Sequence, residues 1–270
     1  MKPFIRLAAA AAALTFASVT VFAEPVLWVS DSRGQLAKID VRTGATTLVG
    51  NTGTLMFDIA FSASGQLFGI DGTSLYSINS TTASATRIGS SGSTSNINSL
   101  VFGSDGSLYG ASNGLYKFNT STGAGSQIGA NFSGGTSSSG DLAFVAGQLY
   151  LSTLGASFDR LTKLNTSTGL NTDVGSIGFA SVFGMASPNG ADLYGFSDNR
   201  VLSINSTTGA GSLLSTASGL SLGSVYGSAF FSEAAPVIPP IPAIPEPSTY
   251  ALLIAGLAGL GWSVKRKQKR

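Results

Sequence analysis

Two acidic residues, Asp58 and Asp141, stand at the same position in two copies of an internal sequence repeat, where their carboxyl oxygens could hold a metal ion. Asn98 lies next to that position in a third copy and would add an amide oxygen. Ca²⁺ prefers several oxygen ligands, at about 2.3 to 2.6 Å, so calcium is the metal that such a set would take. Two carboxylates from five repeats are few, however. The three residues are weak candidates for metal ligands, and the alternative is that the aspartates cap the beginnings of strands.

The residue types that the sequence lacks exclude several kinds of catalysis. The chain contains no Cys and no His, which excludes a thiol nucleophile, a Ser-His-Asp triad and zinc bound by these side chains. No phosphate-binding loop or dinucleotide fingerprint is present, because the Gly-rich clusters fall in turns. We therefore expect no catalytic residues, no cofactor and no enzymatic activity. The alternative is an exported metal-dependent hydrolase with its metal at the mouth of a central channel.

Charge is distributed unevenly along the 270 residues. The whole chain has a formal net charge of +2, but its basic residues are concentrated at the two ends. Between Glu24 and Pro247 there are eight Lys and Arg residues and thirteen Asp and Glu residues, which leaves a formal charge of −5. A mildly acidic body has no electrostatic basis for binding phosphate groups. We therefore expect no nucleic-acid partner.

The elements that position these residues come from a repeat of about 40 residues. A pair formed by Leu and an aromatic residue recurs at intervals of 40, 41, 41 and 44 residues. Its five copies are Leu27-Trp28, Leu67-Phe68, Leu108-Tyr109, Leu149-Tyr150 and Leu193-Tyr194. A second recurring segment, such as Leu75 to Asn79, reads as a short strand that ends in Asp or Asn and precedes Thr-Gly or Thr-Ala. These are turn residues, because their side chains bond the local backbone and Gly accepts positive φ.

Each repeat is expected to hold four strands. One of them precedes the Leu-aromatic pair in four repeats, as in Ile59 to Phe61, and an extra copy, Ser228 to Phe230, stands at the end of the body. The first repeat lacks this strand. A C-terminal strand that joined the first sheet would close a ring and remove its exposed edge. The sequence therefore predicts an all-β fold, a five-bladed β-propeller closed by a C-terminal strand, with an open β-solenoid as the alternative.

The beginning of the chain has the features of a secretory signal peptide. Lys2 and Arg6 precede an apolar run, and the small residues Val21 and Ala23 occupy the two positions that signal peptidase inspects. We expect cleavage between Ala23 and Glu24. The alternative is a retained N-terminal membrane anchor, for which the apolar run is short.

The end of the chain predicts a membrane-spanning helix followed by a basic tail. Tyr250 to Val264 contains no charge, and its fifteen residues would rise about 22 Å as a helix, enough for a thin bilayer with help from the flanking lysines. The basic cluster that follows consists of Lys265, Arg266, Lys267, Lys269 and Arg270. Such a cluster would hold its end in the cytoplasm and leave the repeat body outside.

The sequence Pro245-Glu246-Pro247, an apolar helix and a terminal basic cluster together resemble the PEP-CTERM sorting signal of Gram-negative bacteria. The resemblance implies that exosortase, a membrane-embedded sorting protease, acts at Pro245, Glu246 and Pro247 after transient insertion in the inner membrane. It also implies transfer of the body to the cell surface or the exterior, and an association with exopolysaccharide or biofilm. The alternative is a plain tail anchor whose prolines form a stiff spacer.

Together these observations predict an exported, non-catalytic surface or extracellular-matrix protein that contacts polysaccharide or another envelope component; a receptor for a protein partner is a further alternative. Regularly spaced aromatic residues such as Tyr116 and Tyr150 could stack on sugars, although core packing explains their spacing better. The predicted segments are a signal peptide (1–23), a five-repeat β-propeller (24–233), a Pro-rich linker with the sorting element (234–247), and a transmembrane helix with the basic tail (248–270).

Overall fold

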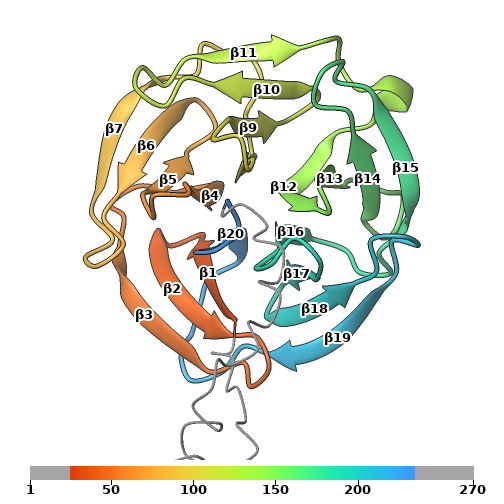
Figure 1. The fold of residues 1–270 in the computed structure, drawn as a ribbon. Coiled ribbons are helices and arrows are strands. Elements are labelled where there is room, and N and C mark those ends of the chain that lie inside the picture. Colours follow the sequence, from red (N-terminus) through yellow and green to blue (C-terminus); the bar gives the residue numbers. More distant parts are fainter. Residues whose placement is uncertain (1–24, 235–270) are drawn as a thin grey trace, which may run out of the picture.

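The repeats of the sequence form five four-stranded antiparallel sheets that surround a common axis (Figure 1). The structure is a computed structural model, and it describes residues 25–234. The sheets are the blades of a five-bladed β-propeller, as the repeat predicted.

Four blades consist of consecutive strands that run from the axis to the outer edge (Figure 1). Blade 2 contains β4 (Asp58–Phe61), β5 (Leu67–Ile70), β6 (Ser74–Ile78) and β7 (Ala85–Ser90). Blade 3 contains β8 (Ser99–Phe102), β9 (Leu108–Ala111), β10 (Leu115–Phe118) and β11 (Gly125–Ile128). A short 3-10 helix, η1 (Ser133–Gly135), precedes blade 4, which contains β12 (Ser138–Val145), β13 (Gln148–Thr153), β14 (Arg160–Leu164) and β15 (Asn171–Ser176). Blade 5 contains β16 (Val182–Ala186), β17 (Leu193–Ser197), β18 (Arg200–Ile204) and β19 (Gly211–Thr216).

Blade 1 combines strands from both ends of the described chain. Its order from the axis outward is β20 (Val225–Phe230), β1 (Val26–Asp31), β2 (Gln35–Asp40) and β3 (Thr46–Asn51). Strand β20 runs antiparallel to β1, with Phe230 opposite Leu27 and Val225 opposite Asp31. The start of β20 therefore lies at the face of the ring away from Pro25, and its end lies next to Pro25.

The Leu-aromatic pair recurs because its aromatic member packs against the innermost strand of the next blade. Four such ring contacts have centroid distances between 5.2 and 5.8 Å: Trp28–Phe61, Phe68–Phe102, Tyr109–Phe144 and Tyr194–Phe230. The fourth repeat differs, since its Tyr150 packs in a cluster with Met185 of β16. Edge-on or tilted aromatic pairs of this kind contribute about 0.5–1.5 kcal/mol each beyond the area that they bury.

The second recurring segment ends in a turn that is held by its Asp or Asn side chain. In blade 3 the Oδ1 atom of Asn119 accepts hydrogen bonds from the backbone N–H groups of Ser121 and Thr122, at 2.9 and 3.0 Å. The N–H group of Gly123 donates to the carbonyl oxygen of Asn119 at 2.8 Å. Asp40, Asn79, Asn165 and Asn205 make the same bonds in the other blades. The turn chemistry expected from the sequence is therefore confirmed.

The core lies between neighbouring blades, so most strands are buried on both faces. In β10, Leu115, Tyr116 and Phe118 are all buried, and only Lys117 is exposed. Leu115 packs toward blade 4, whereas Tyr116 and Phe118 belong to the cluster that joins blades 2 and 3. Tyr116 and Tyr150 are thus core residues, as their regular spacing indicated.

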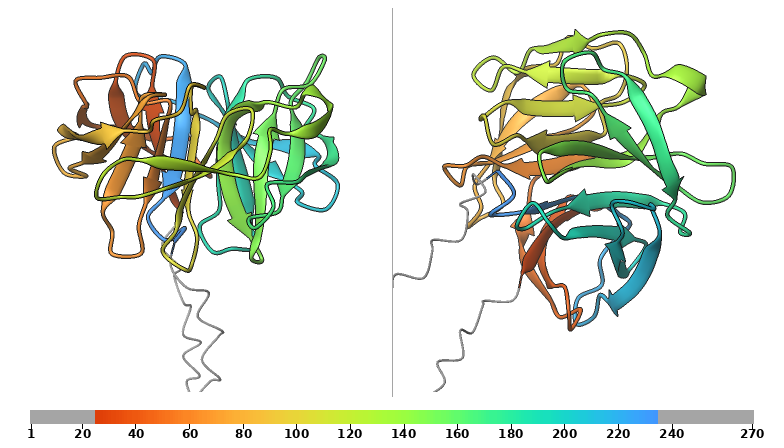
Figure 2. Two further views of the ribbon diagram at one scale, coloured as in Figure 1. Left: turned by 90° about the horizontal axis from the view of Figure 1, so that it is seen from above. Right: turned by 45° about the vertical axis from the view of Figure 1, so that its right-hand side comes forward.

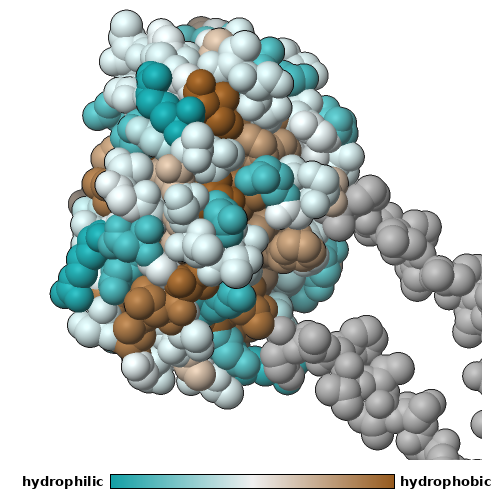
Figure 3. Space-filling view, turned by 90° about the vertical axis from the view of Figure 1, so that its left-hand side faces the viewer, coloured by the Kyte–Doolittle hydropathy of each residue, from teal (hydrophilic) through white to brown (hydrophobic). Residues whose placement is uncertain are grey.

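Both ends of the described chain, Pro25 and Ala234, lie on one face of the ring (Figure 2). The rim seen in Figure 3 is mostly polar or of weak hydropathy, with separate hydrophobic groups of atoms rather than one continuous apolar surface. Large exposed hydrophobic side chains are Val26, Leu48, Leu154, Phe158, Leu170, Leu213, Leu214 and Phe231.

The predicted signal peptide, sorting element, membrane helix and basic cluster lie outside the residues that the structure describes. Within residues 25–234, no helix has the length and apolar character needed to cross a membrane.

Candidate functional site

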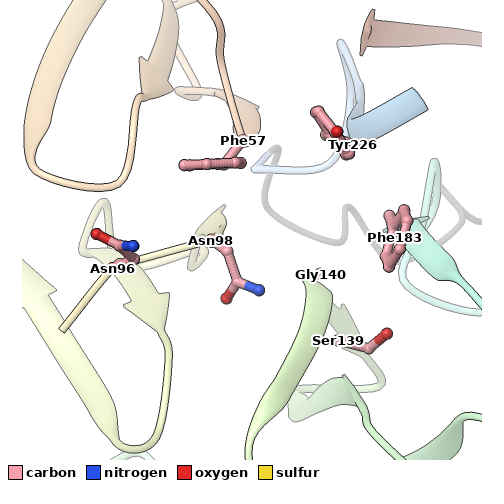
Figure 4. Close-up of a pocket in the computed structure, with 7 residues that line it drawn as sticks. All are labelled: Phe57, Asn96, Asn98, Ser139, Gly140, Phe183 and Tyr226. Carbon is pink, nitrogen blue, oxygen red and sulfur yellow. The ribbon is translucent and has the colours of Figure 1, made fainter. Parts of the chain in front are cut away.

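Asp58 and Asp141 occupy the same position in their repeats, which we call the aligned position; Ser99, Gly184 and Gly227 occupy it in the other three. One mouth of the central channel is lined by the residue that directly precedes this position in each repeat. These five residues are Phe57, Asn98, Gly140, Phe183 and Tyr226. They surround a cavity of about 230 Å³, together with Asn96 and Ser139 (Figure 4). Because the innermost strands begin here, this mouth faces away from Pro25 and from the end of β20.

Three aromatic rings form one side of the mouth cavity (Figure 4). The ring of Tyr226 lies between the other two, with centroid distances of 5.8 Å to Phe57 and 5.9 Å to Phe183. The interplanar angles are 57° and 54°. Each of these side chains is partly exposed, so the rings present apolar surface at the mouth without being core residues.

Polar groups lie on the opposite side of the mouth cavity (Figure 4). The Nδ2 atom of Asn98 donates a long hydrogen bond, 3.4 Å, to the carbonyl oxygen of Ser138. The Oδ1 atom of Asn98 is buried and has no hydrogen-bond partner among the described residues. A buried acceptor without a donor costs about 1–3 kcal/mol, so a ligand that donates to this oxygen would recover that energy.

The hydroxyl group of Ser139 is held by an acidic side chain behind the cavity wall. It donates to Oδ2 of Asp159 at 2.6 Å, and the backbone N–H group of Val182 donates to the same oxygen at 2.7 Å. Burial raises the pKa of Asp159 above its usual value. No charged side chain lines the mouth cavity itself.

Asp58 and Asp141 lie together below the mouth, where both are completely buried. A hydrogen bond joins their carboxyl groups. Asp58 also accepts hydrogen bonds from the backbone N–H groups of Ile59 and Leu100. Its carboxyl group therefore links the inner strands of blades 2 and 3.

Asp141 makes the equivalent links on the other side of the axis. It accepts hydrogen bonds from the N–H groups of Leu142, at 2.7 Å, and Met185, at 2.6 Å. The hydroxyl group of Ser228 donates to Oδ2 of Asp141 at 3.1 Å. The N–H group of Ser228 lies 3.2 Å from Oδ1 of Asp58 and 3.3 Å from Oδ2 of Asp141, so both carboxyl groups also contact β20.

The environment of the two carboxyl groups raises both of their pKa values. Burial, and then the negative charge of Asp141, raise the pKa of Asp58 well above its usual value. Burial raises the pKa of Asp141 to about 8. The folded protein therefore holds protons on this pair at pH values where solvated aspartates are ionised, because two ionised carboxylates in contact without solvent would repel each other strongly.

The glycine at the aligned position of β20 makes room for this pair. A Cβ atom at Gly227 would lie 2.4 Å from Oδ1 of Asp58 and 2.4 Å from its Cα atom. The corresponding position of blade 5, Gly184, faces Ser228 in a similar way, with 2.8 Å to Oγ. Gly227 thus leaves space for Asp58, and Gly184 leaves space for the side chain of Ser228.

The structure brings only two of the three candidate metal ligands together. Asp58 and Asp141 are adjacent, but Asn98 lies in the wall of the mouth cavity. In residues 25–234, no group of three or more acidic side chains is placed to hold a metal ion. The carboxyl oxygens accept backbone N–H groups at the beginnings of inner strands, the capping arrangement that the sequence offered as the alternative.

Sequence reasoning identified Asp58, Asn98 and Asp141 but missed the aromatic side of the mouth. Phe57, Phe183 and Tyr226 each precede the aligned position by one residue. Aligning that neighbouring position across the five repeats would have found them. The aromatic residues proposed from their spacing, Tyr116 and Tyr150, are buried between blades instead.

Comparison with known proteins identifies the sorting signal and the fold. Residues 243–267 match the family described as the PEP-CTERM protein-sorting motif. No curated protein matches the chain. Among solved structures, a chain of the nidogen/laminin complex is 14% identical, with a TM-score of 0.54 and coverage of 78% of this chain and 99% of that chain. A symmetrical protein from a study of de novo evolutionary emergence is 18% identical, with a TM-score of 0.49 and coverage of 75% and 93%.

A gluconolactonase from Xanthomonas campestris is also similar, at 13% identity, a TM-score of 0.45 and coverage of 76% of this chain and 77% of that chain. At such low identity, the nidogen/laminin chain shows a similar fold and nothing more. The matched motif says more: the chain carries a PEP-CTERM sorting signal together with a five-bladed β-propeller body. The motif implies an exported protein that is processed by exosortase, a membrane protein, and then released to the cell surface.

Proposed function

We propose that this protein is a non-catalytic component of the cell surface or extracellular matrix, associated with exopolysaccharide or biofilm. The observation that carries the proposal is the combination of a PEP-CTERM motif with a propeller whose axial carboxyl groups are occupied by its own backbone. Carboxyl oxygens that already accept N–H groups in a sealed site are poorly placed to bind a metal or to activate water.

The sorting route that we propose uses the whole C-terminal segment. Residues 248–270 would span the inner membrane as a helix, and Lys265 to Arg270 would hold its end in the cytoplasm. Exosortase would then cleave at Pro245-Glu246-Pro247 and release the body. Both ends of the described chain lie on the face opposite the mouth cavity. A body tethered by its C-terminal segment would therefore turn the mouth cavity away from the point of attachment.

We further propose that the pairing of β20 with β1 keeps the ring closed in the released protein. The junction between blades 5 and 1 has additional backbone bonds that support this role: the N–H group of Ser218 donates to the carbonyl oxygen of Gly44 at 2.8 Å, and that of Thr46 donates to Ser218 at 2.9 Å. The hydroxyl group of Ser215 donates to the carbonyl oxygen of Val41 at 2.7 Å. A closed ring has no exposed inner edge on which another chain could add a strand.

Cell fractionation and intact-mass measurement test the proposed route. The full chain is expressed in a host with exosortase, and the released form is purified from the surface and the medium. We expect a product that begins at Glu24 and lacks residues 248–270. Replacing Pro245, Glu246 and Pro247 with Ala should leave the chain in the membrane fraction, whereas replacing the linker residues Pro239 and Pro240 should not.

The non-catalytic role has its own test. We expect the released protein to bind extracted matrix polysaccharide without shortening it. Size-exclusion chromatography of the polysaccharide before and after incubation measures its length. Release of small saccharides, or a stoichiometric divalent metal by mass spectrometry that is lost in Asp58→Ala, would contradict the proposal and favour a metal-dependent hydrolase.

A further inference from the structure

We propose that the mouth cavity formed by Phe57, Asn98, Phe183 and Tyr226 binds one uncharged sugar ring of a polysaccharide. This inference rests on the proposed function, because it names the ligand class of a matrix protein. It concerns a site that neither the sorting motif nor the fold assigns.

The aromatic side of the cavity suits the apolar face of a pyranose. A sugar ring carries C–H groups on its faces and hydroxyl groups around its edge, so it stacks on aromatic rings while its edge makes hydrogen bonds. The rings of Phe57, Tyr226 and Phe183 form a tilted arc with successive centroids 5.8 and 5.9 Å apart (Figure 4). All three rings are partly exposed, so they present apolar surface to a ligand at the channel mouth, although Phe57 also packs against the core cluster between blades 2 and 3.

The polar side of the cavity contains a hydrogen-bond acceptor that lacks a donor. The Oδ1 atom of Asn98 is buried without a hydrogen-bond partner among the described residues, and Asn96 also lines the cavity. A sugar hydroxyl group can donate to Oδ1 of Asn98 and accept from an amide N–H group at the same time. A hydrocarbon ligand would leave this acceptor unsatisfied, at a cost that argues against it.

The charges around the cavity favour a neutral ligand over an acidic one. No Lys or Arg side chain lines the cavity to balance a carboxylate. A uronic acid would bring its carboxylate into a cavity whose lining supplies no cation, and the carboxylate would lose part of its hydration there. Uronic acids should therefore bind more weakly than the corresponding neutral sugars.

The size of the cavity restricts how much of a ligand enters. Its volume is about 230 Å³, below the range of about 300–1,000 Å³ that is usual for pockets enclosing a drug-sized molecule. One sugar unit, at a chain end or on a side branch, is therefore the part that enters, and the rest of the polysaccharide remains outside. Because this mouth faces away from both ends of the described chain, a polymer can approach it without meeting the connection to the sorting segment.

Ligand-observed saturation-transfer NMR on the purified released protein tests this site with defined probes. The probes are glucose, galactose, mannose and N-acetylglucosamine, with glucuronic acid as the acidic counterpart of glucose. We expect at least one neutral sugar to bind and glucuronic acid to bind at least tenfold more weakly than glucose. Tyr226→Ala and Phe183→Ala should each weaken binding about tenfold, and Asn98→Asp should weaken it at neutral pH.

Phe231→Ala is the matched control, because Phe231 is an exposed aromatic residue on the opposite face, 62% exposed. It should leave sugar binding unchanged. Circular dichroism and melting curves identify any variant that fails to fold. Tyr226→Phe keeps the aromatic ring and should retain binding, so it replaces Tyr226→Ala if that variant has a folding defect.

Absence of binding to every neutral sugar, or binding that the pocket variants do not weaken, overturns the proposed site. Either result leaves the surface location and the absence of polysaccharide cleavage intact, so failure of the site is distinguishable from failure of the proposed function.

Discussion

The carboxyl groups of Asp58 and Asp141 are hydrogen-bonded to each other across the axis of the ring, although blades 2 and 4 are not neighbours. Ser228 of β20 contacts both carboxyl groups. Three blades, one of them containing strands from both ends of the body, are thus joined at one buried point. Because burial raises the pKa of both acids, this junction is sensitive to pH.

The first prediction concerns stability against pH. Aspartates in the unfolded chain lose their protons near pH 4, whereas the folded protein keeps the proton of Asp141 up to a pKa of about 8. Between these values the folded state binds more protons, so the free energy of unfolding should fall as pH rises, by about 1.4 kcal/mol per pH unit for each extra proton. Urea unfolding followed by circular dichroism at several pH values between about 4 and 8 measures this slope.

Two variants separate the axial pair from other acids. Asp141→Asn removes one of the titrating groups and should reduce the slope, while Asp159 and Glu233, whose pKa values burial also raises, keep it above zero. Asp105→Asn is the control, because backbone hydrogen bonding by Ser107 lowers the pKa of Asp105 and confines its contribution to lower pH. A stability that increases across this window in the unmodified protein would mean that the pair is ionised when folded.

The repeat made the fold predictable because the same physical contact recurs in each copy. The aromatic member of the pair must fill the gap between adjacent blades, as Phe68 does against Phe102, so its type and spacing are preserved within the one chain. The turn after each second segment needs an Asp or Asn oxygen at one position, as Asn119 shows. Such constraints leave a regular pattern in the sequence.

The candidate site could be predicted only in part, because residues at the channel mouth differ from blade to blade. Phe57, Asn98 and Gly140 hold the same place in three repeats yet share no chemistry. The contact between Asp58 and Asp141 depends on the depth at which two non-adjacent strands begin near the axis, which spacing along the chain does not specify. Tyr116 was open to two interpretations because propeller strands are buried on both faces, so alternation does not separate surface from core.

The second prediction concerns the space beside Asp58. A methyl group at Gly227 would lie 2.4 Å from Oδ1 and Cα of Asp58, closer than any tolerable contact. Because the obstacle includes backbone of a neighbouring blade, Gly227→Ala should destabilise the protein by about 3 kcal/mol or more. Gly134→Ala is the control: its φ of 69° strains an alanine, but nothing lies within 4 Å of the added atom, so about 1 kcal/mol is expected. Equal midpoints of urea unfolding for the two variants would contradict the close approach.

The third prediction concerns the one turn that departs from the Thr-Gly pattern. Ala83 has a φ of 65°, where Gly123 in the next blade has 80°. Replacing Ala83 with Gly relieves about 1 kcal/mol of backbone strain but removes a fully buried methyl group of similar worth. The variant should therefore be nearly as stable as the unmodified protein. The reverse change, Gly123→Ala, should be clearly destabilising, because its Cβ atom would lie 2.6 Å from the carbonyl oxygen of Gly89. Thermal melting of the two variants side by side measures the contrast.

The last prediction tests whether blade 1 is as firmly joined as the others. Phe230 of β20 is fully buried and packs against Tyr194 at 5.5 Å, just as Phe102 of β8 is buried and packs against Phe68 at 5.3 Å. If the pairing of β20 with β1 persists in solution, Phe230→Ala and Phe102→Ala should each lower the free energy of unfolding by about 3–5 kcal/mol. If β20 detaches readily, the packing of Phe230 contributes little to the stability of the folded protein. Phe230→Ala should then lower the free energy of unfolding much less than Phe102→Ala does. Hydrogen exchange gives an independent measurement: the amide of Ser228 should be protected as strongly as the amide of Leu100, because the former donates to Asp58 and Asp141 and the latter to Asp58. Fast exchange at Ser228 beside slow exchange at Leu100 would show that the ring opens at blade 1.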